Sequence, residues 1–456
     1  MDLKNRKVLV FGSGISGIAA AVLLEELNAE VILYDGNDKL DAQEIKNKVN
    51  EKAGRPCGTK VVVGELPKDI IASLDLVVLS PGIPCDLPLV KEFKAHGIEI
   101  TGEIELAYMA GKGNVYAITG TNGKTTSTTL LGEIMKAYFP EVYVVGNIGN
   151  PYTSVALEQS ENAVTVAEIS SFQLETIKTF RPHACAITNI TPDHLNRHHS
   201  MEEYIRVKKL INMNQTASDA IVLNYEDEIL REFGKEAKGQ VIFFSSRRKL
   251  EKGLYYEDGR VVIANGSTES VLVNTDELHL LGLHNFENIM TAVGIALFAG
   301  VDIETIRKVV RDFRGVEHRI EFVGEIDGIR YYNDSKGTNP DAAIKAIQAM
   351  NRPTLLIGGG YDKESSYEEW INSFDGKVKK LVLIGQTKEK IAQAALSCGF
   401  PEKDIVLCED LREAVDVCKR EARSGDAVLL SPACASWGQF DNYEQRGRMF
   451  KEFVRN

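Results

Sequence analysis

The sequence is poor in cysteine, and its cysteines are not arranged as in a structural site. It has seven cysteines among 456 residues, and no two of them form a C-x-x-C pair. A disulfide framework needs an even number of cysteines at high density, and a four-cysteine zinc site needs closely spaced ligands. We therefore expect free thiols and a cytoplasmic location.

Low-complexity tracts, internal repeats and long apolar runs are also missing. The only uncharged run that invites attention, residues 8–24, is interrupted by Gly12, Gly14 and Gly17 and leads into Glu25. This pattern predicts a strand, a turn and a helix, and not a signal peptide or a membrane span. We therefore expect no membrane insertion.

Basic residues are outnumbered by acidic ones, 53 to 65, which gives a formal net charge of −12. A nucleic-acid partner needs clustered lysine and arginine to neutralise its phosphates. We therefore expect no nucleic-acid partner, although local basic pockets for small phosphorylated ligands remain compatible with this charge.

What the sequence does contain is a regular alternation of apolar strands and helical segments. Its length corresponds to about three domains, and such alternation is typical of parallel sheets with helical crossovers. We predict three α/β domains: a Rossmann-like domain at 1–98, a central P-loop ATPase-like domain at 99–314 and a C-terminal Rossmann-like domain at 315–456. A connector is expected around Ile100–Gly113, and short strands and turns over Gly239–Asn274.

A glycine-rich turn follows the first predicted strand. Gly12 to Gly17 fit G-x-G-x-x-G, and Asp35 ends the next strand, as in a dinucleotide fingerprint. The glycines let a diphosphate approach the backbone at the start of a helix. The pattern fits any diphosphate, including a nucleotide-sugar, and the alternative is a tight turn that binds nothing.

A second glycine loop lies between the strand expected at Asn114–Thr119 and a helix. Its residues Gly120 to Thr125 can cradle a triphosphate, with Lys124 on the phosphates and the Thr125 hydroxyl on Mg²⁺. Ile118 stands where the Walker pattern has its first glycine, so the loop is a variant. A chain with both loops does not fit a dehydrogenase.

Two polar segments follow later apolar runs. Glu168 and His194 each lie just beyond a predicted strand, at the edge where open α/β sheets bind ligands. A carboxylate and an imidazole suit a metal at a phosphoryl-transfer site, while the alternative for His194 is a solvent-facing loop. We expect surface positions for His198 and His199, and spacing alone makes Lys208 an ordinary surface lysine.

Several motifs, in order, resemble those of the Mur ligases and the folylpolyglutamate synthetases. The resemblance begins with the second glycine loop and the segments around Glu168 and His194, and it runs nearly end to end. The later stretches that carry it are Leu283–Asn288, His318–Arg319, Asn333–Asn339, Ser431–Ser436 with Phe440, and Glu444–Gly447. Together with this last part, Ser80–Gly82 and Gly102–Leu106 bring it closest to the family member that adds D-glutamate.

The resemblance implies an ATP-dependent acid–amino-acid ligase of cytoplasmic peptidoglycan synthesis, and hence a role in cell-wall growth, cell shape and cell division. ATP would phosphorylate the carboxylate of UDP-N-acetylmuramoyl-L-alanine, and the amine of D-glutamate would attack the acyl phosphate. Amide, ADP and phosphate would result. In the family a lysine is carbamylated to ligate Mg²⁺, and the matching position is Lys208, so the resemblance replaces the surface position that spacing alone suggests. Two Mg²⁺ ions and a monomeric enzyme are also expected.

The resemblance also assigns roles position by position. The catalytic residues would be Lys124, Glu168, His194 and Lys208, and the metal ligands Thr125, Glu168, His194 and Lys208. The UDP-sugar would contact Gly14, Ile15, Ser16, Gly17, Asp35, Gly82 and Asn147. ATP would contact Gly120, Thr121, Asn122, Gly123, Lys124, Thr125, Thr126, Asn285, Asn288, His318, Arg319 and Asp334. D-Glutamate would contact Thr338, Lys363, Ser436 and Tyr443.

Some residues depart from the family pattern, and other functions were weighed. Gly36 stands where a hydroxyl residue is expected, and Trp437, Gly438 and Tyr443 differ from the usual pocket. Another Mur ligase is one alternative, but the Asp-Asn-Pro-Arg motif of the third-step ligase is absent. A folylpolyglutamate synthetase would not need the first glycine turn. A non-catalytic nucleotide-sugar sensor would not need the four catalytic residues together.

Overall fold

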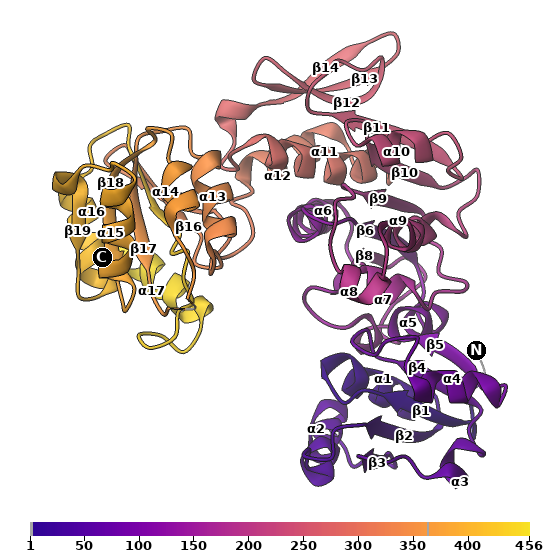
Figure 1. Ribbon diagram of the computed structural model, residues 1–456. Helices are drawn as coiled ribbons and strands as arrows, with labels where there is room; N and C mark the ends of the chain where they lie inside the picture. The colour runs from indigo at the N-terminus through magenta and orange to yellow at the C-terminus, as the bar shows by residue number, and fades with distance from the viewer. Residues whose placement is uncertain (1–2, 363) are drawn as a thin grey trace. The chain divides into compact units, whose positions relative to one another are not determined.

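The computed structural model describes residues 3–362 and 364–456, and in it the chain forms two compact units. The first unit contains the residues up to Leu272 together with Glu287–Val309, and the second contains Val273–Phe286 and Val310–Asn456. Three sheets with flanking helices build these units (Figure 1). The expectation of three α/β domains built on largely parallel sheets is confirmed, while the residue limits of the three domains stay a prediction.

The first sheet has the strand order β3-β2-β1-β4-β5, and its strands are all parallel. Its strands are β1 (Lys7–Phe11), β2 (Glu30–Asp35), β3 (Lys60–Val63), β4 (Leu76–Leu79) and β5 (Glu99–Gly102). The helices are α1 (Ile15–Glu26), α2 (Ala42–Ala53), α3 (Lys68–Ile71) and α4 (Pro88–Ala95). The order reverses between β1 and β4, and ligands bind at such a switch point, beyond the carboxyl ends of the strands.

Alternate residues of β1 enter different cores, which explains why the strand is apolar throughout. Val8 and Val10 pack in the core that includes α1 and α2, whereas Leu9 and Phe11 pack in the core that includes α4. A parallel sheet is buried on both faces and therefore reads as a continuous apolar run, not as an alternating one.

The second sheet has the order β14-β13-β12-β11-β10-β9-β6-β8-β7. Its strands are β6 (Asn114–Thr119), β7 (Val142–Gly146), β8 (Val164–Glu168), β9 (Ala184–Ile187), β10 (Ala220–Asn224), β11 (Gln240–Ser245), β12 (Lys252–Glu257), β13 (Arg260–Asn265) and β14 (Glu269–Asn274). The pairing is parallel from β7 to β12, and β13 is antiparallel to β12. The short strands expected over Gly239–Asn274 are confirmed, and they extend this sheet.

The helical elements that follow the first sheet are mostly short. They are α5 (Glu103–Ala110), α6 (Lys124–Tyr138), η1 (Tyr152–Ser154), α7 (Ser171–Leu174), α8 (Leu195–His198), α9 (Met201–Lys209), η2 (Leu210–Asn212), α10 (Glu228–Phe233), η3 (Thr275–Glu277), α11 (Leu283–Phe298) and α12 (Ile303–Asp312).

The segment expected as a connector is ordered, and it fastens the first sheet to the second. It forms β5, which pairs with β4, and then α5. The buried carboxylate of Glu105 accepts hydrogen bonds from the backbone N–H groups of Lys178, Thr179 and Phe180, at 2.8, 2.6 and 3.0 Å. A carboxylate that satisfies three N–H groups at once fixes the position of the loop that carries them, so the two sheets act as one unit.

The third sheet has the order β15-β16-β20-β17-β18-β19 and is parallel except for the β15–β16 hairpin. Its strands are β15 (Glu321–Ile326), β16 (Ile329–Asn333), β17 (Thr354–Gly359), β18 (Val378–Ile384), β19 (Ile405–Leu407) and β20 (Ala427–Leu430). The helices are α13 (Pro340–Ala349), α14 (Glu368–Asn372), α15 (Lys388–Ser397), η4 (Glu402–Asp404), α16 (Leu411–Glu421) and α17 (Tyr443–Arg455).

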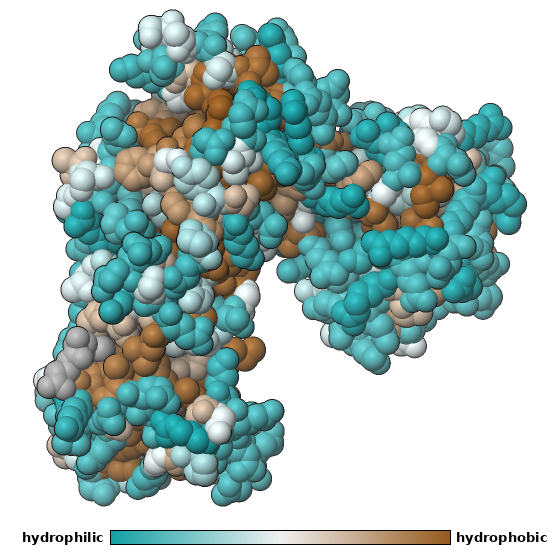
Figure 2. Space-filling view, turned by 180° about the vertical axis from the view of Figure 1, so that it is seen from behind, coloured by the Kyte–Doolittle hydropathy of each residue, from teal (hydrophilic) through white to brown (hydrophobic). Residues whose placement is uncertain are grey.

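Most of the face shown in Figure 2 is hydrophilic, with apolar residues gathered in limited patches between charged ones. Among the described residues, the large apolar side chain with the greatest exposure is Ile15, at 78%. No helix within the described ranges is both long and apolar enough to cross a membrane.

Candidate active site

The first glycine turn connects β1 to α1 and is built by close backbone approach. A Cβ on Gly17 would lie 1.8 Å from the carbonyl oxygen of Gly12, so position 17 admits only glycine. Within the described residues no side chain caps the start of α1, whereas Asp41 caps α2. The first N–H groups of α1 are therefore available to a ligand at the turn.

Asp35 stabilises this turn. One of its carboxylate oxygens accepts hydrogen bonds from the Ser13 N–H at 3.0 Å and the Ser13 hydroxyl at 2.7 Å. Burial alone would raise the pKa of Asp35, but these bonds and one from the Asn37 N–H outweigh it and lower the pKa below its ordinary value. The residue is thus an ionised group at the edge of the turn.

The loop that carries Gly82 follows β4 and lies against the same turn. The Ser80 hydroxyl donates to the Gly12 carbonyl at 3.1 Å, and a Cβ on Gly12 would meet Ser80 at 2.9 Å. Gly82 itself is exposed and has no neighbour that a Cβ would touch. The structure therefore brings the predicted UDP-sugar residues Gly14 to Gly17, Asp35 and Gly82 to one edge of the first sheet.

The second glycine loop joins β6 to α6, and its lysine lies back over its own backbone. Lys124 Nζ donates to the carbonyls of Gly120 at 2.9 Å and Thr121 at 2.8 Å. Gly120 and Gly123 have φ values of +143° and +83°, and glycine adopts both without steric cost. Within the described ranges no side chain caps α6, so the start of α6 can receive phosphate oxygens.

Asn147 and Glu168 meet at the ends of β7 and β8. The Asn147 amide donates to Glu168 Oε1 at 2.7 Å, and Glu168 is 1% exposed. The other carboxylate oxygen, Oε2, is buried and has no hydrogen-bond partner among the described residues. A buried carboxylate oxygen without a partner is costly, and it marks a place for a cation or a donor from a ligand.

Lys208 is buried, at 1% exposure, so the surface position that spacing alone suggested is wrong. Its Nζ donates to the Gly120 carbonyl at 2.7 Å and the Thr119 hydroxyl at 3.1 Å, which places it beside Lys124. Burial lowers the pKa of Lys208 well below its usual range, and the charge of Lys124 lowers it further. Burial and the neighbouring charge of Lys124 therefore favour the neutral form of this amine.

His194 is the first of the predicted histidines and lies at the start of α8 with a left-handed φ of 52°. Its side chain is half exposed, and its ring centroid lies 4.9 Å from that of Phe172. His199 is exposed and pairs with Asp86, as expected of a surface residue. The surface position expected for His198 is wrong, because its ring is 2% exposed and bonds the Ser171 hydroxyl at 2.9 Å.

In the second unit, the predicted site residues follow β16 and β20, which are neighbouring strands. Asp334 lies beyond β16 and accepts a hydrogen bond from the Ser431 hydroxyl at 2.7 Å. Burial raises the pKa of Asp334 to about 7. Ser436 is buried in the loop after β20, while Thr338 is partly exposed.

Three further predicted residues of this unit, His318, Tyr443 and Asn285, have contacts within it. His318 is buried with a left-handed φ of 65°, and its Nδ1 lies 2.9 Å from the Asn333 amide nitrogen. Its ring meets that of Tyr443 edge-on at 6.0 Å. Asn285 donates to the Leu281 carbonyl at 2.7 Å. Lys363, predicted to bind D-glutamate, lies outside the described residues.

Arg446 holds the two loops together, and the sequence prediction missed it. Its guanidinium is fully buried and donates to the Ser335 hydroxyl at 3.0 Å, the Ser335 carbonyl at 2.8 Å and the Cys434 carbonyl at 3.2 Å. The sequence did contain a signal that Arg446 is buried. Helical spacing puts Arg446 on the same face of α17 as the apolar Phe450 and Phe453.

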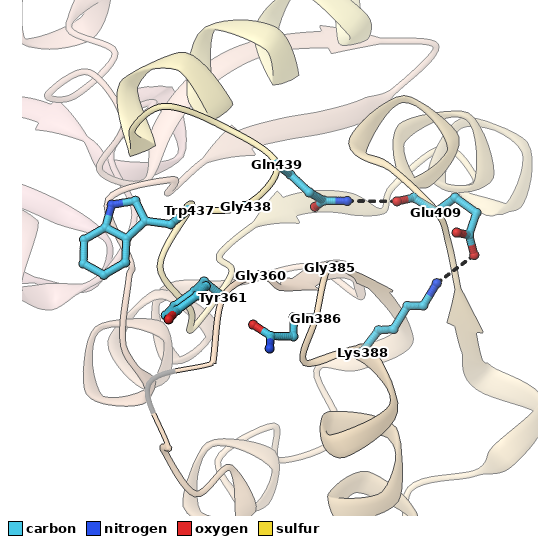
Figure 3. Close-up of a pocket in the computed structure, with 9 residues that line it drawn as sticks. All are labelled: Gly360, Tyr361, Gly385, Gln386, Lys388, Glu409, Trp437, Gly438 and Gln439. Atoms are coloured by element: carbon cyan, nitrogen blue, oxygen red, sulfur yellow. Dashed lines mark hydrogen bonds and ion pairs between the residues drawn. The ribbon is translucent and has the colours of Figure 1, made fainter.

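A separate cavity of about 440 Å³ opens beyond the carboxyl ends of β17, β18 and β19 (Figure 3). Tyr361 and Trp437 line it with ring centroids 5.6 Å apart, and on the other side Lys388 and Glu409 form an ion pair of 2.7 Å. The Gln439 amide donates to the Glu409 carbonyl at 2.9 Å. The cavity therefore adjoins Ser436 through Trp437.

Three family models match the chain in succession. They describe a Mur ligase MurD-like N-terminal domain at residues 6–102, a Mur ligase middle domain at 118–296 and a Mur ligase glutamate ligase domain at 318–434.

Full-length relatives and solved structures agree with these matches. The UDP-N-acetylmuramoylalanine–D-glutamate ligase of Lachnoclostridium phytofermentans is 53% identical over 456 residues, covering 100% of this chain and 99% of that protein. The protein of the same name from Clostridioides difficile is 45% identical and covers 100% of both chains. The UDP-N-acetylmuramate-alanine ligase structure from Thermotoga maritima has a TM-score of 0.58 at 19% identity, covering 99% of each chain, and supports the fold alone.

Proposed function

The chain belongs to the Mur ligase family of ATP-dependent amide ligases, and from this membership we propose that it joins D-glutamate to UDP-N-acetylmuramoyl-L-alanine in peptidoglycan synthesis. The observation that carries the proposal is the end-to-end identity to ligases of that name, 53% for the relative from Lachnoclostridium phytofermentans. The reaction has two steps. The substrate carboxylate takes the γ-phosphoryl group of ATP, and the amine of D-glutamate then displaces phosphate to form the amide.

The first step requires charge on the transferred phosphoryl group to be neutralised. Lys124 is the cation of the second glycine loop and the first residue of α6, whose start has no side-chain cap among the described residues. Its charge and the first N–H groups of the helix are the groups that would receive phosphate oxygens. In the structure Lys124 donates to the Gly120 and Thr121 carbonyls. We infer that phosphate oxygens replace these carbonyls as its acceptors when ATP binds.

The donor set of this region fits Mg²⁺. Oε2 of Glu168 is a buried carboxylate oxygen with no hydrogen-bond partner among the described residues. Thr125 lies in the first turn of α6, and His194 is half exposed. The carboxylate and hydroxyl oxygens suit a hard divalent ion, and the imidazole nitrogen of His194 would be a borderline ligand beside them. When bound, Mg²⁺ would neutralise phosphate charge and polarise the reacting oxygens. Two such ions form part of the proposal.

Carbamylation of Lys208 is supported by its surroundings. Burial and the neighbouring Lys124 lower the pKa of Lys208, and only a neutral amine can attack CO₂. The nitrogen lone pair forms a bond to the carbon of CO₂, one C=O π bond breaks with its electron pair passing to oxygen, and one of the nitrogen protons leaves to solvent. The product is an anion on a long stem that suits a metal ligand, whereas an ammonium would repel the metal.

The second unit provides the residues proposed for D-glutamate. Thr338, Ser436 and Tyr443 stand on the loops after β16 and β20 or at the start of α17. Arg446 fixes these loops through Ser335 and Cys434, so the amino-acid site would be preorganised. Lys363 would supply the cation for a carboxylate. A cytoplasmic location completes the proposal, because ATP and UDP-sugars are made in the cytoplasm, and we propose a monomer from the resemblance alone.

Measuring phosphate release separates this function from its alternatives. The purified chain is given ATP, Mg²⁺ and UDP-N-acetylmuramoyl-L-alanine, and each candidate amino acid or dipeptide is added in turn. We expect release that depends on D-glutamate. Release with another amino acid would identify a different Mur ligase, and no release with any of them would favour the non-catalytic sensor.

A further inference from the structure

A single arginine joins the loop of the first sheet that carries Gly82 to the loop of the second that carries His194. Arg197 lies in α8, three residues after His194, and its Nη2 donates to the Ile83 carbonyl at 3.0 Å. Ile83 follows Gly82 directly. Both loops belong to the first unit, so this contact lies within one compact body.

Glu175 holds the guanidinium in a bidentate ion pair. Arg197 Nε and Nη2 lie 3.2 and 2.6 Å from the two oxygens of Glu175, and the side chains are only 11% and 13% exposed. A pair this buried loses much of its Coulomb energy to desolvation, so it contributes little net stability. What it does supply is geometry, because the planar fork of arginine meets a carboxylate in one orientation.

Phe172 connects the arginine to His194. The Arg197 guanidinium carbon lies 4.9 Å from the centre of the Phe172 ring, and the His194 ring lies 4.9 Å from the same centre. The neighbouring His198 is fastened to Ser171, the first residue of α7. The short helix α8 is thus fixed against α7 on both sides of Arg197.

We propose that Arg197 is a positioning residue that sets His194 relative to the UDP-sugar loop, with Glu175 and Phe172 as its supports. The inference rests on the proposed function, because it assumes that Gly82 contacts the UDP-sugar and that His194 belongs to the proposed Mg²⁺ site. Arg197 acts through these two residues. Binding of the UDP-sugar at one loop is thereby coupled to the geometry at the other.

The conservative variant Arg197→Lys tests this coupling. An ammonium can donate to Ile83 or to Glu175, but it cannot reproduce the bidentate pair and the third bond together. We expect the Michaelis constant for UDP-N-acetylmuramoyl-L-alanine to rise and kcat to fall, each by about tenfold, since small misplacements of reacting groups have effects of this size or larger. The Michaelis constant for D-glutamate should change less than about twofold.

The matched control is Arg181→Lys. Arg181 also forms a bidentate pair, with Asp219 at 2.8 and 3.1 Å. Among the described residues its side chain makes no hydrogen bond to the loop that carries Gly82 or to the loop that carries His194. A purely structural role for Arg197 predicts that both variants behave alike. Should Arg197→Lys fail to fold, Phe172→Leu keeps the apolar bulk and removes the ring face shared by Arg197 and His194.

Two further measurements separate a failure of this inference from a failure of the proposed function. Calorimetric titration of the UDP-sugar without ATP measures its binding separately from catalysis. We expect about tenfold weaker binding in Arg197→Lys. In a double-mutant cycle with His194→Asn, the effect of Arg197→Lys on kcat should largely vanish, because the two residues act as one. Independent, additive effects would overturn the inference. Failure of the unmodified protein to ligate D-glutamate would instead overturn the proposed function.

Discussion

Replacing Lys208 removes the group on which the proposed metal site depends. In the structure its Nζ makes two hydrogen bonds, to the Gly120 carbonyl and the Thr119 hydroxyl, at 2.7 and 3.1 Å. Losing them costs about 1–3 kcal/mol of folding free energy. That cost is partly offset because a buried ammonium is itself unfavourable, and Lys124 still donates to Gly120. We therefore expect Lys208→Ala to remain folded.

The catalytic loss should be much larger. Removing one preorganised electrostatic group from a reacting centre costs about 2.7–4 kcal/mol, or 10²–10³ in kcat. Lys208→Arg should be equally impaired, because a guanidinium stays charged and forms no carbamate. A small carboxylic acid should restore part of the activity of Lys208→Ala by occupying the vacant anion site.

Phosphate release at saturating substrates is the assay, and urea unfolding of each variant controls for the fold. The reasoning would be refuted by a fully active Lys208→Arg enzyme. It would also be refuted if Lys208→Ala lost activity only in proportion to its lost stability, with no rescue by carboxylic acids.

Three further results are expected. Lys124→Ala should abolish phosphate release while far-ultraviolet circular dichroism stays unchanged, since it removes the cation on the transferred phosphoryl group; near-native release would contradict the nucleotide assignment. Calorimetry should show no NAD or NADP binding but clear UDP-sugar binding, because Asp35 is bound to Ser13. The raised pKa of Asp334, about 7, means that the folded state keeps a proton which the unfolded state loses near pH 4. Unfolding free energy should therefore fall by about 2–3 kcal/mol from pH 5 to 8, and Asp334→Asn should remove that part of the slope.

The sequence predicted best those parts of the fold in which one local signal decides the outcome. The strand at Asn114–Thr119 was predicted with its observed limits, because apolar runs bounded by glycine or polar residues are typical of buried parallel strands. The glycine turns were predicted equally well, since their backbone conformations restrict the residue type.

Predictions failed where a contact distant in sequence decides burial. Lys208 and His198 read as surface residues, yet both are buried, because Gly120 and Ser171 provide their hydrogen-bond partners from other strand-end loops. No local pattern reports such partners, and the family resemblance alone corrected the view of Lys208. The pair between Arg197 and Glu175 joins residues 22 positions apart, and neither residue has a distinctive neighbourhood in the sequence.

The segment expected as a connector shows the same limit. Residues 100–113 form the end of β5 and the helix α5, and Glu105 is buried because it accepts three N–H groups from the loop at Lys178–Phe180. A glutamate in a short helix is usually exposed. Only the tertiary structure shows that this one joins two sheets.

The path of a single oxygen atom tests the central claim most directly. UDP-N-acetylmuramoyl-L-alanine is prepared with a heavy oxygen isotope in its carboxylate and is incubated with the protein, ATP, Mg²⁺ and D-glutamate. If the carboxylate is phosphorylated and the amine then displaces phosphate, mass spectrometry will find one heavy oxygen in the released phosphate and the D-glutamyl amide as product. Unlabelled phosphate, or labelled phosphate without the amide, would contradict the account.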